Sequence, residues 1–156
     1  MNSTAVNLED VTLEIKQEIF VKAPLEKTFA ALLDQMGPYN EVDNGRAMPM
    51  KLEAWPGGRW FRDLGDDNGH FWGSVQAIKR PTLLEICGPL FMSHAVASNL
   101  QYRLTEVDGG TLIKFHQSAF GLLTEDDRHA KQGWEHIHTL VKARAEASGA
   151  GKSAAH

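Results

Sequence analysis

The last part of the chain constrains the fold most strongly, because apolar or small residues recur over residues 124–147 with the spacing of one helical face. Thr124 is suited to cap the start of this helix together with Asp127, and Ser148 and Gly149 are expected to end it. A helix of this span would be about 36 Å long at 1.5 Å per residue. The sequence therefore predicts one long amphipathic helix that must cover another layer. Its repeating residues are Ala130, Gly133, Trp134, Ile137, Leu140, Val141 and Ala145.

Composition sets the class of protein. With 156 residues, 42% of them hydrophobic, and a formal net charge of −4, the chain matches one soluble globular domain. We place this domain at residues 11–147 and expect mobile ends at 1–10 and 148–156. Cys87 is the only cysteine, which excludes an intramolecular disulfide and favours a cytoplasmic location. The sequence has no bilayer-spanning apolar run and no basic patch, so neither membrane insertion nor nucleic-acid binding is expected.

Strand patterns fill the chain between its first residues and the long helix. Apolar and polar residues alternate over 11–21, and Pro24 then begins a short helix that Gly37 and Pro38 end. After a loop at 39–49, turn residues separate further strands at 51–55, 59–64, 70–79, 82–87, 95–107 and 111–119. The order predicts an α+β fold, in which a curved antiparallel sheet of about six to seven strands wraps around the C-terminal helix.

Neither metal chemistry nor nucleophilic catalysis has a clear signature. His136 and His138, the closest pair among the seven histidines, would lie about 160° apart around a helix axis at about 100° per residue, so they cannot chelate one ion. The sequence contains no H-E-x-x-H and no G-x-S-x-G motif. No spacing brings Cys87 to a histidine. We therefore expect no metal and no cofactor.

Large rings and two polar groups at inward positions form the candidate ligand site. Gln117 shares the strand parity of Phe115, and His138 lies one helical turn from Trp134. The alternative that these residues are plain core stays open, because pockets and cores use the same residue types. Arg59 and Arg62 are suited either to an anionic ligand group or to solvating a strand. The candidate ligand-binding residues are Trp60, Phe71, Tyr102, Phe115, Gln117, Trp134 and His138.

Short motifs follow one another along nearly the whole chain, among them Val21-Lys22-Ala23-Pro24, Pro56-Gly57-Gly58-Arg59-Trp60, Gly110-Thr111 and Gly133-Trp134. In this succession the chain resembles the SRPBCC superfamily, which includes START and Bet v 1-like proteins. More narrowly, the chain resembles the branch named for homology to the activator of Hsp90 ATPase. The resemblance implies a helix-grip fold with a cavity for apolar ligands between sheet and helix. Two departures are Tyr39 in a segment that often carries Trp, and Gln117 where many relatives have His.

Three hypotheses for function remain. The first is binding of an apolar or amphipathic small molecule in the cavity between the helix and the sheet. The second is an enzyme similar to polyketide aromatase/cyclases, in which Gln117, His138 or Tyr102 moves a proton. The third is a cochaperone that resembles the Hsp90 activator and binds a protein partner. A homodimer is compatible with each of them.

Overall fold

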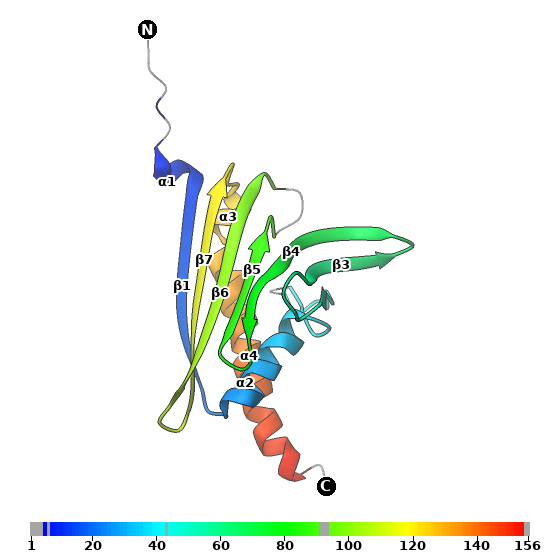
Figure 1. Cartoon of the computed structure of the whole chain (residues 1–156), viewed down its shortest axis with the longest axis vertical. Coiled ribbons are helices and arrows are strands. Elements are labelled where there is room, and N and C mark those ends of the chain that lie inside the picture. The colour runs from blue at the N-terminus through cyan, green and yellow to red at the C-terminus, as the bar shows by residue number, and fades with distance from the viewer. Residues whose placement is uncertain (1–4, 6, 43, 91–93, 155–156) are drawn as a thin grey trace.

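An antiparallel sheet forms the larger layer of the molecule (Figure 1). Within residues 5, 7–42, 44–90 and 94–154, which this computed structural model describes, the sheet has seven strands in the order β1-β7-β6-β5-β4-β3-β2. Strands that follow one another from β2 to β7 are neighbours, and β7 pairs back onto β1 over ten residue positions. The strands are β1 (Thr12–Val21), β2 (Lys51–Leu52), β3 (Arg59–Gly65), β4 (Asn68–Lys79), β5 (Leu83–Gly88), β6 (Val96–Val107) and β7 (Gly110–Gly121).

Two longer helices lie along one side of this sheet, as Figure 1 shows. They are α2 (Leu25–Met36) and α4 (Ala130–Ala154), and two single-turn helices, α1 (Leu8–Val11) and α3 (Glu125–Arg128), precede β1 and α4. The sheet curves around α4, while the β3–β4 hairpin extends away from both helices. This arrangement confirms the predicted α+β helix-grip fold with its short helix after the first strand.

The hydrophobic core lies between the sheet and the two long helices. Along β7, Thr111, Ile113, Phe115, Gln117 and Ala119 are buried in strict alternation, because successive strand side chains point to opposite faces. Along α4 the buried residues follow the predicted helical spacing, since positions three and four apart share one face. These helix residues are Trp134, Ile137, His138, Val141 and Ala145.

The long helix differs from its prediction at both ends. Thr124 Oγ1 accepts a hydrogen bond from the backbone N–H of Asp127 at 3.1 Å, and the Asp127 carboxylate accepts one from Thr124 N at 2.8 Å, so the predicted cap is present. That cap starts only α3, which ends at Arg128 and is followed by His129 (φ −96°, ψ 9°) as its C-cap. At the other end α4 continues through Ser148 and Gly149 to Ala154, so the predicted end there is wrong. Gly lowers helix stability by only about 1 kcal/mol, and no proline follows to break the helix.

Strand boundaries differ by a few residues as well, and two of the differences have a clear local cause. The first strand begins at Thr12 because Val11 belongs to α1, and the strand expected over 51–55 ends at Leu52. A tight turn replaces its remainder, with Glu53 N donating to Arg59 O at 2.8 Å. A Cβ at Gly58 would overlap the carbonyl of Glu53, so only glycine allows this close approach.

Candidate functional site

A cavity of about 550 Å³ lies between the loop after α2, the base of the β3–β4 hairpin, and the start of α4. One wall is apolar and carries three indole rings, and polar side chains occupy other positions of the lining. The apolar wall consists of Met36, Val42, Met48, Trp60, Trp72, Trp134 and Ile137. The polar positions are Asn40, Glu41, His94, Asp126, His129 and Gln132. This composition is typical of a small-molecule site, where apolar area supplies most of the contact and a few polar groups orient the ligand.

The aromatic wall is fixed by contacts between elements far apart in the sequence. The indole N–H of Trp60 donates to the carbonyl of Met36 at 2.8 Å, which ties β3 to the last turn of α2. This bond satisfies a carbonyl that the end of a helix leaves without an intrahelical partner. Trp72 packs edge-on against Trp60, with ring centroids 5.1 Å apart. The wall is therefore held in place by the secondary structure.

A histidine–aspartate pair lies at the helix side of the cavity. His94 Nδ1 and Asp127 Oδ1 are 2.8 Å apart, and the other carboxylate oxygen of Asp127 accepts hydrogen bonds from the backbone N and hydroxyl of Thr124. Burial by itself raises the pKa of Asp127, but the hydrogen bonds from Thr124 and His94 outweigh it and hold the pKa below its ordinary value. The carboxylate therefore stays ionised and orients the imidazole.

A second polar chain is enclosed deeper in the interior. His138 Nδ1 lies 2.6 Å from Gln17 Oε1, and His138 Nε2 lies 2.9 Å from the hydroxyl of Tyr102. Because Gln17 uses its Nε2 to donate to Lys131 O, its Oε1 faces the ring, and His138 must carry its proton on Nδ1. Tyr102 then donates to Nε2. Burial lowers the pKa of His138 to about 3 and raises that of Tyr102 well above its ordinary value, so both groups are neutral.

The rings around His138 fill the space between sheet and helix. Phe115 lies 4.9 Å from both Tyr102 and Trp134, measured between ring centroids, and Trp134 stacks on His138 at 6.0 Å. The indole N–H of Trp134 donates to Gln117 Oε1 at 2.7 Å. Trp134 thus has two roles, since it belongs to this cluster and also lines the cavity.

The predicted site residues therefore divide into three groups. Trp60 and Trp134 line the cavity. The second group is buried as predicted but lies behind the cavity wall, and it consists of Tyr102, Phe115, Gln117 and His138. The inward orientation predicted for Phe71 is wrong, because its side chain is 51% exposed. An irregularity in the β3–β4 pairing follows Trp60, after which Phe61 pairs with Phe71, and the buried ring of β4 is Trp72.

Sequence reasoning missed the polar part of the cavity. Asn40 lies in the loop after α2, His94 precedes β6, and Asp127 was singled out only as a capping residue. No periodic pattern marks loop residues such as Asn40 and His94. Gln17 did carry a signal, because it is a polar residue on the apolar face of β1.

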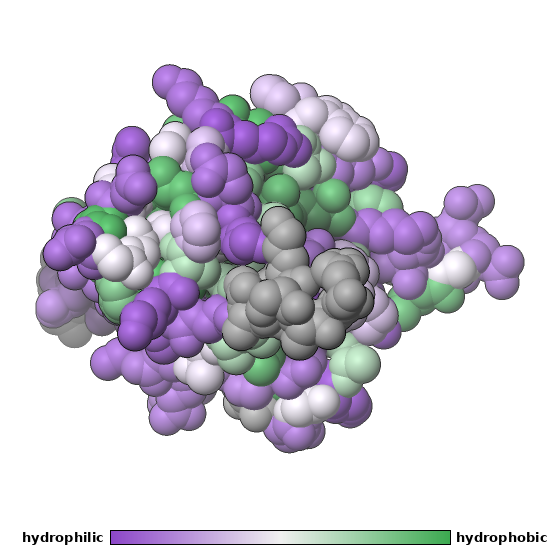
Figure 2. All heavy atoms as spheres, turned by 90° about the horizontal axis from the view of Figure 1, so that it is seen from below, coloured by the Kyte–Doolittle hydropathy of each residue, from purple (hydrophilic) through white to green (hydrophobic). Residues whose placement is uncertain are grey.

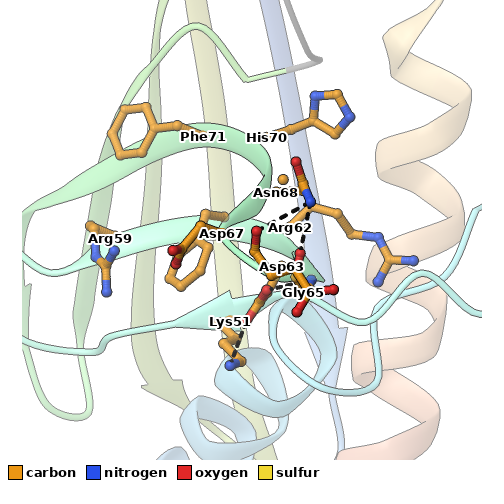
Figure 3. Close-up of a pocket in the computed structure, with 12 residues that line it drawn as sticks. Lys51, Arg59, Arg62, Asp63, Gly65, Asp67, Asn68, His70 and Phe71 are labelled. Atoms are coloured by element: carbon orange, nitrogen blue, oxygen red, sulfur yellow. Dashed lines mark hydrogen bonds and ion pairs between the residues drawn. The ribbon is translucent and has the colours of Figure 1, made fainter.

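Phe71 lies at a separate hollow of about 630 Å³ on the β3–β4 hairpin (Figure 3). Figure 2 shows this hairpin protruding at the right with a largely hydrophilic tip. The two arginines considered for an anionic ligand lie here and are engaged by the protein. Arg59 makes two side-chain hydrogen bonds to the Glu53 carboxylate, at 2.9 and 2.7 Å, and Arg62 donates to Pro49 O at 2.7 Å. Exposed groups of this kind form a solvated surface, so the cavity beside α4 is the better candidate site.

The comparisons with known proteins identify the family and the fold of the chain. The model of the family described as "Activator of Hsp90 ATPase homolog 1-like protein" matches residues 22–146. The chain belongs to this family. No curated protein matches the chain. In the part of the chain that the structure describes, no helix is long and apolar enough to cross a membrane, and no group of three or more His, Cys, Asp or Glu residues is placed to hold a metal.

Solved structures share the family's fold at low sequence identity. A protein from Rhizobium leguminosarum is 20% identical with a TM-score of 0.67, over 86% of this chain and 95% of that one. The Aha1 dimer from Colwellia psychrerythraea is 17% identical with a TM-score of 0.62, over 86% and 96%. The di-domain ARO/CYC StfQ from the steffimycin biosynthetic pathway is 13% identical with a TM-score of 0.63, over 92% of this chain and 53% of that one. At these identities the likeness shows the fold alone.

Proposed function

We propose that this member of the activator of Hsp90 ATPase homologue family binds an apolar or amphipathic small molecule in the cavity beside α4. The observation that carries the proposal is the cavity's apolar wall, with the rings of Trp60, Trp72 and Trp134 and the side chains of Met36 and Met48. Its volume of about 550 Å³ falls within the range of about 300 to 1,000 Å³ that ligand sites occupy. Rings and thioethers supply apolar contact to a ligand without requiring one fixed shape.

A cyclase-like enzyme, the activity that the name of the ARO/CYC neighbour describes, is the second candidate. It needs a proton-transferring group at the cavity wall. Tyr102 and His138 are poorly suited, because they lie behind Trp134 and hydrogen-bond each other. The His94–Asp127 pair is better suited, since His94 lines the cavity and Asp127 orients its ring. This pair is the observation that favours the second candidate.

Gly133 offers a direct test of ligand binding. It lies on α4 in the cavity lining, and a Cβ added there would meet nothing within 4 Å. Leucine at this position would occupy cavity volume, whereas alanine would add a single methyl group. We expect the neutral dye Nile red to bind the unchanged protein with increased fluorescence, and Gly133→Leu to weaken that binding at least tenfold.

Gly133→Ala is the matched control, because it makes the same backbone change with little loss of volume. Gly133→Ala should bind Nile red nearly as the unchanged protein does, and should raise the free energy of unfolding by about 0.5 to 1 kcal/mol, because alanine favours the helix over glycine. Equal dye affinity in the leucine and alanine variants would contradict binding in this cavity.

A further inference from the structure

His94 presents a hydrogen-bond acceptor to the cavity. Its Nδ1 lies 2.8 Å from Asp127 Oδ1, and an ionised carboxylate only accepts hydrogen bonds, so the neutral ring carries its proton on Nδ1. The lone pair is then on Nε2. Among the described residues, none makes a hydrogen bond to this nitrogen, and His94 lines the cavity. Nε2 is therefore available to a donor on a bound molecule.

Asn40 adds a second acceptor to the lining of the same cavity. Its side chain is only 6% exposed and lines the same cavity. The amide Nδ2 donates to Met48 O at 3.0 Å, which fixes the orientation of the carboxamide. Its Oδ1 accepts no hydrogen bond from any residue that the structure describes. This oxygen is free to accept a hydrogen bond from a donor on a ligand in the cavity.

The charged groups of the lining carry one sign. Glu41 and Asp126 line the cavity, and no Lys or Arg does so among the described residues. Glu41 Oε1 lies 3.0 Å from His136 Nε2, and its Oε2 makes no hydrogen bond with the residues that the structure describes. A ligand carboxylate placed here would lose its hydration without gaining a cation, and it would be repelled by both acids.

We propose that the cavity selects a neutral apolar molecule that carries a hydroxyl group, that this hydroxyl donates to Nε2 of His94 or Oδ1 of Asn40, and that carboxylate-bearing ligands such as fatty acids are rejected. The inference rests on the proposed function, since it specifies the ligand class of the same cavity. It makes Asp127 a positioning residue, which holds the proton of His94 on the nitrogen that faces away from the ligand.

Three naphthalenes of nearly equal size test this specificity by isothermal titration calorimetry at pH 8. 1-Methoxynaphthalene probes the apolar wall, 1-naphthol adds a hydroxyl donor, and 1-naphthoic acid adds a carboxylate. We expect 1-naphthol to bind about threefold to tenfold more tightly than 1-methoxynaphthalene, the range of one net hydrogen bond. 1-Naphthoate should bind at least tenfold more weakly than 1-methoxynaphthalene.

His94→Asn separates recognition from folding. The amide nitrogen of asparagine lies near the position of Nδ1 and keeps the hydrogen bond to Asp127, while nothing replaces Nε2. The preference for 1-naphthol is the ratio of the dissociation constants of 1-methoxynaphthalene and 1-naphthol. In this variant the ratio should fall below half of its value in the unchanged protein, because only Asn40 still offers an acceptor to the hydroxyl. The control is His116→Asn, on the opposite face of β7 beside Glu14, and it should leave the preference unchanged.

Each alternative result has a distinct meaning. If 1-naphthol and 1-methoxynaphthalene bind the unchanged protein equally, or if 1-naphthoate binds most tightly, the proposed specificity is overturned while small-molecule binding stands. An unchanged preference in His94→Asn would overturn the role of His94. Failure of all three compounds to bind would overturn the proposed function together with this inference.

Discussion

The buried His138 should make the stability of the protein depend on pH between about 7 and 5, above the range in which most carboxylates titrate. The side chain is 2% exposed, and burial lowers its pKa from 6.5 to about 3. In the unfolded chain the ring takes up a proton below about pH 6.5, whereas the folded protein does not accept it until about pH 3. The stabilisation from the neutral ring is therefore complete above pH 6.5 and is lost as the pH falls toward 3.

The size of the effect follows from the difference in proton binding. Each pH unit inside the window lowers the free energy of unfolding by about 1.4 kcal/mol, since the unfolded state binds one proton more than the folded state. Between pH 7 and pH 5 this amounts to about 2 kcal/mol. The full shift corresponds to about 5 kcal/mol, which is comparable with the total stability of many domains.

Urea unfolding followed by tryptophan fluorescence at pH 7, 6 and 5 measures this loss. His138→Gln removes the titrating ring, so the difference in stability between the unchanged protein and the variant should shrink by about 2 kcal/mol from pH 7 to pH 5. His116→Gln, which changes a partly exposed histidine on the outer face of β7, is the control for replacing a histidine with glutamine, and the pH slope should fall more in His138→Gln than in this variant. A His138→Gln protein with the same pH slope as the unchanged protein would refute the reasoning, as would an NMR titration of His138 near pH 6.5.

Three further predictions concern the packing around the cavity. Trp134→Ala should lower the free energy of unfolding by about 3 kcal/mol, the low end for a buried ring, because one side of the ring already borders a cavity. Trp134→Phe should lower it by about 1 to 2 kcal/mol through loss of the indole N–H bond to Gln117. Chemical denaturation measures both values, and a loss under about 1 kcal/mol for the alanine variant would contradict the packing. Trp60→Phe should lower the free energy of unfolding by about 1 to 3 kcal/mol, because it leaves the buried carbonyl of Met36 without its donor. A thermal melting temperature equal to that of the unchanged protein would contradict this bond. Gly58→Ala should unfold the turn before β3 through overlap with the Glu53 carbonyl, so normal expression with an unaltered circular dichroism spectrum would disprove the close approach.

The sequence predicted the regular part of the fold because periodicity is a local property. Alternation along β6 and β7 correctly oriented Tyr102, Phe115 and Gln117 toward the interior, and helical spacing did the same for Trp134 and His138. The resemblance of the motifs to the SRPBCC superfamily supplied the global arrangement that local patterns do not contain. The structure and the family match confirm that arrangement.

The errors arise where tertiary structure overrides the local pattern. Strand parity predicted that Phe71 points toward the interior. An irregular pairing after Trp60 reverses which residues of β4 face the interior, so Trp72 is buried and Phe71 is exposed. The cap at Thr124 was correct, yet it starts a separate single-turn helix, because the chain bends at His129 before α4.

The polar groups of the cavity could not be predicted because they depend on contacts between distant loops. Asp127 is recognisable in sequence as a capping residue, but its second oxygen bonds His94, which lies 33 positions earlier. Asn40 reaches the cavity through the loop after α2, whose path follows from hydrogen bonds to Gly37 and Met48. Pattern reasoning of this kind identifies which surfaces are apolar, and the structure is needed to show which polar groups meet there.

Methyl NMR of the methionines tests binding in the cavity most directly. Met36 and Met48 line the cavity, whereas Met50 is buried outside the lining and serves as an internal control. On titration of 13C-methyl-methionine-labelled protein with 1-methoxynaphthalene, the account predicts saturable shifts of the Met36 and Met48 methyl signals, with Met50 nearly unchanged. Shifts confined to other signals, or none at concentrations where calorimetry detects binding, would contradict a ligand site beside α4.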